Sequence, residues 1–194
     1  MKKLTCALTA ATATILTGCV LTSVHPFYAS KDVVFEPSLL GQWTNTQQAN
    51  ERWTFEKEGQ NSYLLTYVSG TDVSIVQAHL FKLDGQMFMD IAGQEQEWKV
   101  QPPPTPSHLL LRVTQLSPTV SMIPLNHDWL KALLEKDPGA LHHELIKGPK
   151  ADDARVVLTG ETTELQVFLT KHLKNEEAWK DVFELKRDEA VGSK

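Results

Sequence analysis

The chain has 194 residues, a formal net charge of −5 at pH 7 and 41% hydrophobic residues. This length is consistent with a single domain that buries a sizeable core. An acidic chain without basic clusters lacks the Lys and Arg side chains that neutralise phosphates, so we expect no nucleic-acid partner and no electrostatic binding to anionic lipid.

Residues 1–18 have the pattern of a secretory signal peptide. Lys2 and Lys3 give a positive start, and residues 4–16 form an uncharged stretch rich in Ala, Thr and Leu. A helix that spans a bilayer needs about 20 apolar residues, so this stretch is too short to serve as a transmembrane anchor. A charged start followed by a short apolar segment predicts a signal that is removed from the mature protein.

The signal ends in Leu16-Thr17-Gly18-Cys19, which resembles the lipobox of bacterial lipoproteins. The resemblance implies cleavage between Gly18 and Cys19, an S-diacylglyceryl thioether on the cysteine, and acylation of its new amine by a fatty acid such as palmitate. The chemistry requires a cysteine because the thiolate is the nucleophile. The alternative is an ordinary signal peptide followed by a cysteine that stays free.

The lipid would determine where the domain is located. Burial of acyl chains contributes about 0.8 kcal/mol per CH₂, and one chain alone gives only marginal attachment, so two or three chains make the attachment stable. Val20 is not the aspartate that the resemblance links to inner-membrane retention. We therefore expect an outer-membrane anchor with the domain in the periplasm of a Gram-negative cell, an expectation that a Gram-positive source would overturn.

The cysteine count restricts the chemistry of the mature chain. Cys6 is lost with the signal and Cys19 is consumed by lipid, and the sequence contains no other cysteine. We expect no intramolecular disulfide, no cysteine-bound metal and no cysteine nucleophile.

Residues 19–37 are predicted to form a lipidated tether to the domain. The tether contains two apolar clusters, at residues 25–28 and 33–35, which would be costly to leave in water. We expect the tether to dock against the domain. The alternative is an exposed aromatic patch that contacts a partner.

Residues 38–187 are predicted to form one mostly β domain. From Leu39 the apolar residues alternate with polar ones between turns, which is typical of antiparallel strands. Asp84-Gly85 is the strongest hairpin signal, because both residues tolerate positive φ. The residues expected to share strand faces are Leu39, Gly41 and Trp43; Trp53 and Phe55; Tyr63, Leu65 and Tyr67; Val73, Ile75, Gln77, His79, Phe81 and Leu83; and Met87, Met89 and Ile91.

Beyond these strands, residues 94–106 are expected to form a loop, with a short strand at 98–100 and a stiff proline-rich connector at 102–106. Two further strands are predicted around Ser117-Pro118, one at 109–113 and one at 120–122.

In the C-terminal third, the spacing of the apolar residues changes from the two-residue alternation of strands to the three- and four-residue spacing of helices. Asn126 or Asp128 is expected to cap a helix that carries Trp129, Leu130, Leu133 and Leu134 and ends at 137–139. A further helical turn is expected to carry Leu141 and Leu145, and residues 155–158 are expected to form a short strand. A second helix with a buried stripe is predicted at 165–173, capped by Thr159 or Thr162. A closing strand at 182–185 and a polar tail at 188–194 complete the chain.

The pair Gly41 and Trp43 near the first strand, followed by short antiparallel strands and a late helix, resembles the lipocalin-like (calycin) barrels. The order of residues 40–43 and 53–55 also resembles that of bacterial envelope lipoproteins. The likeness covers residues 37–125 and departs from the family afterwards, where two or three helices are expected. It implies that the tryptophan plugs one barrel end beneath an arginine from a late strand. Arg112, Arg155 and Arg187 are the alternatives for that arginine.

The seven histidines do not predict a metal site. His142-His143-Glu144 lacks the i, i+4 spacing of a helical zinc motif. His127-Asp128 is explained by a helix start, whereas His79 and His108 lie on strands where they could face a cavity. The sequence also lacks a nucleophile elbow and a phosphate-binding loop, so we expect no catalytic residue, cofactor or metal ligand.

Two functions follow as hypotheses. The first is a lipid-anchored, non-enzymatic binding module that takes a small apolar ligand in its barrel. The second is an envelope protein-interaction module that uses the helical region 126–173 and binds no ligand. A fold class does not by itself indicate that a protein catalyses a reaction.

Overall fold

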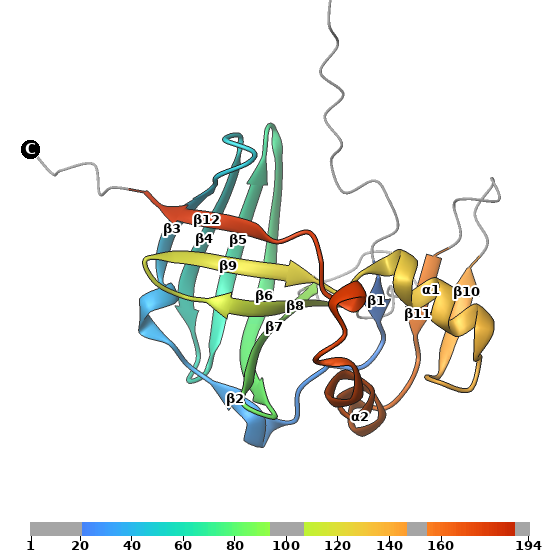
Figure 1. The fold of residues 1–194 in the computed structure, drawn as a ribbon. Coiled ribbons are helices and arrows are strands. Elements are labelled where there is room, and N and C mark those ends of the chain that lie inside the picture. The colour runs from blue at the N-terminus through green and yellow to red at the C-terminus, as the bar shows by residue number, and fades with distance from the viewer. Residues whose placement is uncertain (1–20, 94–106, 147–154, 189–194) are drawn as a thin grey trace, which may run out of the picture.

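Eight antiparallel strands close into a barrel in the computed structural model, which describes residues 21–93, 107–146 and 155–188 (Figure 1). The mainly β prediction is therefore confirmed. The barrel strands, in chain order, are β3 (Gly41–Asn45), β4 (Glu51–Glu58), β5 (Ser62–Ser69), β6 (Asp72–Leu83), β7 (Gln86–Gly93), β8 (His108–Gln115), β9 (Thr119–Pro124) and β12 (Phe183–Arg187).

The last strand of the chain closes the barrel. β12 pairs with β3 on one side and with β9 on the other, and β9 also pairs with β8. The closing strand was predicted at 182–185, but the family likeness was expected to end at residue 125. The barrel instead takes one strand from beyond the helices, because strand pairing joins segments that are distant in sequence.

Alternation of apolar residues explains the barrel core. Along β4, Trp53 and Phe55 are buried while Arg52 and Glu56 are exposed, since successive side chains point to opposite faces of a strand. The buried side chains of the barrel core are Leu39, Trp43, Trp53, Phe55, Tyr63, Leu65, Ala78, Leu80, Met89, Ile91, Leu111, Val113, Val120, Met122 and Leu185.

The β6 residues expected to share one strand face do so, but that face points away from the barrel core. Ala78 and Leu80 belong to the barrel core, whereas Phe81 packs on the other side of the sheet. Val73 and Ile75, which lie on the same strand face as Phe81, are 61% and 50% exposed. Both faces of this strand carry apolar residues, so alternation alone does not say which face points inward.

The β6–β7 turn agrees with the prediction, whereas the start of the first barrel strand does not. The β6–β7 turn has positive φ at Asp84 and Gly85, 48° and 76°, which confirms the predicted hairpin. Leu39, expected on the first strand, instead lies in the 3₁₀ helix η2 (Pro37–Leu39) that leads into it.

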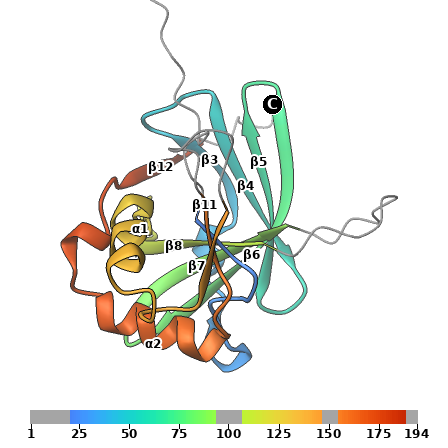
Figure 2. The same cartoon turned by 90° about the vertical axis from the view of Figure 1, so that its right-hand side faces the viewer.

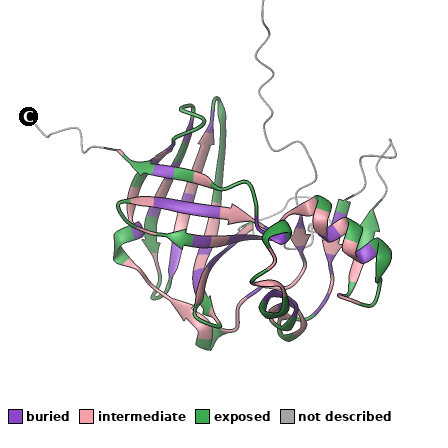
Figure 3. Cartoon of the chain, viewed as in Figure 1, coloured by how far each residue is buried: buried purple, intermediate pink, exposed green. Residues whose placement is uncertain are grey.

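A second layer packs on the outer face of β6, β7 and β8 (Figures 1 and 2). Strands β10 (His143–Ile146), β11 (Arg155–Leu158) and β1 (Thr22–Ser23) extend the sheet from β8, with β1 and β11 parallel. Helices α1 (His127–Lys136), α2 (Thr162–His172) and η4 (Glu176–Ala178) lie beside them. Figure 3 shows buried segments on both layers. The second core joins the barrel residues Phe81, Phe88 and Leu110 to the helices.

The tether docks against the domain, as its apolar clusters predict. Phe27 is almost completely buried, and its backbone N–H donates to Asp90 Oδ2 at 2.9 Å. The 3₁₀ helix η1 (Ser30–Asp32) follows, and β2 (Val33–Val34) then pairs with β6. The tether from Leu21 to Pro37 is therefore part of the folded body.

The predicted N-terminal cap is confirmed for α1 but not for α2. Asn126 caps α1, since its side chain accepts from the backbone N–H groups of Asp128 and Trp129. Neither Thr159 nor Thr162 caps α2, whose N-cap is Glu161 without a side-chain hydrogen bond. The Thr162 hydroxyl donates instead to the Pro26 carbonyl at 2.7 Å, a contact between segments distant in sequence.

The helical turn expected around Leu141 and Leu145 is wrong. Residues 143–146 form β10, which pairs with β11 from His143↔Leu158 to Ile146↔Arg155. The apolar residues of this short segment fit the spacing of a helix or of a strand equally well. Pairing with β11 therefore decides its secondary structure. The described part of the C-terminal third therefore contains two α-helices, α1 and α2. The strand predicted at 98–100, the proline connector at 102–106 and the signal and lipidation residues lie outside the described residues, as do residues 189–194 of the tail.

Candidate functional site

One end of the barrel is sealed by a tryptophan beneath an arginine. The Trp43 Nε1–H donates to the Leu39 carbonyl at 2.8 Å. The Arg187 guanidinium carbon lies 4.1 Å from the centroid of the Trp43 ring, within the range of a cation–π contact. Arg187 Nη1 also donates to the Leu40 carbonyl at 2.8 Å. Of the three alternatives, Arg187 is therefore the arginine that covers Trp43.

Gly41 makes this arrangement possible. Its φ of +116° is a conformation that L side chains rarely adopt. A Cβ at this position would lie 2.7 Å from Arg187 Nη1. The glycine and the tryptophan two residues later thus serve one structural purpose, which is to seat the arginine against the ring.

The opposite end of the barrel interior is polar. Glu51 and Asn45 lie at the ends of β4 and β3 that are far from Gly41, and Ser69 is the cross-strand partner of Glu51. All three are buried, with Glu51 only 4% exposed. Asn45 Nδ2 donates to Glu51 Oε2 at 2.8 Å. A carboxylate is therefore held inside the barrel by an amide.

Four buried polar atoms at this end lack hydrogen-bond partners within the described part of the chain. They are Glu51 Oε1, Trp53 Nε1, Tyr67 Oη and Ser69 Oγ. Buried polar groups are normally hydrogen-bonded, so a group of unpaired ones is a site at which water or a ligand is expected. We call Glu51, Trp53, Tyr67 and Ser69 the polar cluster.

Aromatic rings surround the polar cluster. The centroids of Trp53 and Tyr67 lie 5.3 Å apart in an edge-to-face arrangement, and Phe183 lies 5.8 Å from Trp53. Burial raises the pKa of Tyr67 above its usual 10; the neighbouring Ser69 hydroxyl opposes this rise and the Glu51 carboxylate adds to it. Tyr67 therefore carries its proton at neutral pH and remains a hydrogen-bond donor.

The sequence did not single out Glu51 or Ser69. A signal was present, because Glu51 precedes Trp53 and Phe55 at two-residue spacing and so shares their inward face. A charged residue on a buried face is a strong indication of function, since burial of a charge is costly without a partner.

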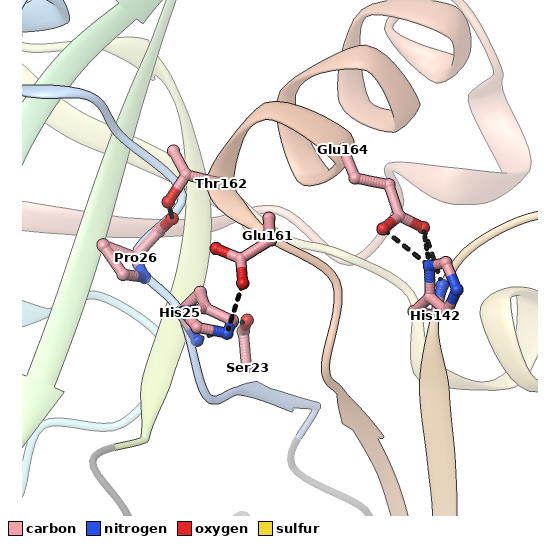
Figure 4. Close-up of polar contacts among 7 residues, drawn as sticks. All are labelled: Ser23, His25, Pro26, His142, Glu161, Thr162 and Glu164. Carbon is pink, nitrogen blue, oxygen red and sulfur yellow. Dashed lines mark hydrogen bonds and ion pairs between the residues drawn. The ribbon is translucent and has the colours of Figure 1, made fainter.

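The histidines do not converge on one centre. Figure 4 shows His142 beside Glu164, with Nδ1 and Oε2 2.8 Å apart, and His25 beside Glu161 at 3.6 Å. His143 Nδ1 instead lies 2.8 Å from the Leu141 carbonyl. Hydrogen bonds from the His142 backbone and ring lower the pKa of Glu164 against the effect of its desolvation. No group of three metal-ligating side chains occurs in residues 21–93, 107–146 and 155–188.

His79 and His108 face outward, toward the docked tether, and not into the barrel. His108 Nδ1 lies 2.7 Å from Asp90 Oδ1, and Asp90 is fully buried. His79 packs against Tyr28, with ring centroids 4.5 Å apart. Burial lowers the pKa of His79, and the carboxylates of Asp90 and Glu58 oppose that effect. These contacts hold the tether in place.

The burial of the His172 ring leads us to expect that the stability of the protein depends on pH. Its ring lies between Phe168 and Trp129, and its Nε2 is buried without a partner in the described residues. Burial, together with Lys171, lowers the pKa of His172 below 6.5. Protonation therefore favours the unfolded chain, so its contribution to stability is complete above about pH 6.5 and is lost as the pH falls toward the folded-state pKa.

We expect urea unfolding between pH 7.5 and 5 to show a decreasing free energy of unfolding, with a smaller decrease for His172→Phe, which keeps a ring but cannot be protonated. Equal pH dependence in the two proteins would show that His172 does not contribute.

A scan against protein-family models, a search of curated proteins and a search of solved structures gave no match to this chain. Within the described residues, no helix has both the length and the apolar character needed to cross a membrane.

Proposed function

We propose that the chain is a membrane-anchored bacterial lipoprotein whose barrel is a non-enzymatic binding module for a small, mostly apolar ligand. The polar cluster is the observation that carries this proposal. Its four unpaired buried atoms lie among aromatic rings at one end of an otherwise apolar barrel interior. Ligand sites in proteins are mostly apolar with a few polar groups that fix orientation, which matches this arrangement.

The packing limits the size of the ligand. Trp43 and its neighbours fill the sealed end with buried side chains, so the proposed ligand sits toward the polar cluster. An eight-stranded barrel is just wide enough to be filled by its side chains or to hold one small molecule. The ligand we propose has an apolar body and a polar group that pairs with Trp53 Nε1, Tyr67 Oη or Glu51 Oε1.

The anchor part of the proposal rests on the lipobox. Cys19 would carry the acyl chains, and the sequence departs from the inner-membrane pattern at position 20, which supports an outer-membrane location with the domain in the periplasm.

Native mass spectrometry of the full chain, released from membranes in detergent, tests the ligand. We expect a noncovalent adduct, and a loss of most of that adduct in Glu51→Gln combined with Ser69→Ala. Glu56→Gln is the matched control, because Glu56 lies on the exposed face of the same strand. A wild-type protein that carries no adduct and takes up none from an added lipid extract would contradict the proposal.

A second function, interaction with an envelope protein, is favoured by one observation in the region 126–173. β10 pairs with β11 alone, so its other edge is unpaired within the described residues, and Leu145 and Ile146 on it are 39% and 54% exposed. An unpaired edge with apolar side chains is a surface to which another strand can add. Site-specific crosslinking from position 146 in cells, compared with position 56, would detect such a partner.

A further inference from the structure

A cavity on the outer side of the barrel is lined by two cationic side chains, Arg112 and Lys174, and by one carboxylate, that of Glu176. It measures about 270 Å³ and is lined by Arg112, Leu173, Lys174, Asn175, Glu176 and Trp179. Arg112 points away from the barrel core, because Leu111 and Val113 on either side of it point inward. The cavity therefore lies between β8 and the segment that links α2 to η4, apart from the polar cluster.

The wall of this cavity is firmly held. Trp179 forms a β-bridge with Leu125, and its Nε1–H donates to the His172 carbonyl at 3.0 Å. The Asn126 N–H donates to the Ala178 carbonyl at 2.9 Å. These bonds tie the segment after α2 to the end of β9, so the Trp179 ring is held in place at the wall of the cavity.

Arg112 has no anionic partner in the described residues. Nη1 donates to the Leu173 carbonyl at 3.1 Å, the guanidinium carbon lies 5.6 Å from the Trp179 ring centroid, and Nε is buried without a partner. Neither Arg112 nor Lys174 forms an ion pair with a carboxylate of residues 21–93, 107–146 or 155–188. Burial lowers the pKa of Arg112, and no carboxylate acts on that pKa in the opposite direction.

We propose that this cavity binds a small organic carboxylate, with its oxygens at Arg112 and Lys174 and its apolar body on Trp179 and Leu173. A partly desolvated cation without a counterion is costly, and an anion removes that cost. Arginine is the residue best suited to bind planar carboxylates, and charge-assisted hydrogen bonds are the strong ones. The volume of the cavity limits the size of the ligand to about one ring or one short chain.

Isothermal titration calorimetry of the full chain in detergent, with benzoate as the probe, tests this site. We expect saturable binding of benzoate and about tenfold or weaker binding of benzamide, which has the same ring without the charge. Inorganic phosphate should bind more weakly than benzoate because it lacks an apolar body. Absence of benzoate binding, or equal binding of benzamide, would overturn the proposal, and phosphate binding as tight as benzoate would overturn the role of Trp179.

Three variants locate the site. Arg112→Gln should weaken benzoate binding about tenfold or more, with folding checked by circular dichroism. Lys174→Gln changes an exposed residue, so it tests the cavity even if Arg112→Gln fails to fold, and it should weaken binding several-fold. Lys171→Gln is the control, because Lys171 is an exposed lysine of α2 that does not line the cavity. Equal affinity in Lys174→Gln and Lys171→Gln would place benzoate elsewhere.

Discussion

Replacing Trp43 with alanine is expected to lower the free energy of unfolding by about 3–5 kcal/mol, the range found when large aromatic side chains are removed from cores. Trp43 is almost completely buried, donates to the Leu39 carbonyl and supports the guanidinium of Arg187. The alanine variant therefore leaves a cavity, an unpaired carbonyl and an arginine without its ring. Urea unfolding followed by far-UV circular dichroism measures the loss.

Trp43→Phe is the matched control for this prediction. It keeps an aromatic face beneath Arg187 but loses the Nε1–Leu39 hydrogen bond and part of the volume. We expect a destabilisation that is clearly smaller than that of the alanine variant. A Trp43→Ala protein that unfolds at the same urea concentration as the wild type would show that this end of the barrel does not depend on the tryptophan.

Replacing Cys19 with alanine is expected to abolish membrane attachment, because the proposed acyl chains have no other position in the sequence at which to form a thioether after cleavage. The protein should move from the membrane pellet to the soluble fraction, and labelling with radioactive palmitate should be lost. Loss of two or three chains removes far more apolar burial than one chain needs for marginal binding.

Cys6→Ala is the control for the anchor, since Cys6 is the other cysteine of the chain and lies within the predicted signal. This variant should remain membrane-bound and labelled. If Cys19→Ala were to stay in the membrane fraction with palmitate still attached, the lipobox interpretation would be wrong.

The local features were predictable because short-range chemistry determines them. The Asp84-Gly85 hairpin requires only that two residues tolerate positive φ. Asn126 caps α1 through two backbone N–H groups within three residues of itself. The apolar clusters of the tether predicted its docking for the same reason, since an exposed Phe27 would be costly whatever it packs against.

The residues of the candidate site were harder to predict from the sequence than the local features. Gly41 and Trp43 were identified by their resemblance to a barrel motif, but three arginines remained possible as the cover until β12 placed Arg187 beside β3. Glu51 and Ser69 become neighbours only through the register of β4 and β5. Arg112 and Lys174 line one cavity although they are separated by two helices, and spacing along the chain carries no information about such a pair.

By itself the sequence determined the strand-rich body, its turns and helix start, and the expectation of a lipid on Cys19, because each depends on residues close together in the chain. Only the tertiary structure decided that β12 closes the barrel, that Ala78 and Leu80 point inward, and that residues 143–146 form a strand. The physical reason is that strand partners contribute packing and hydrogen bonds across long separations, and these outweigh ambiguous local preferences.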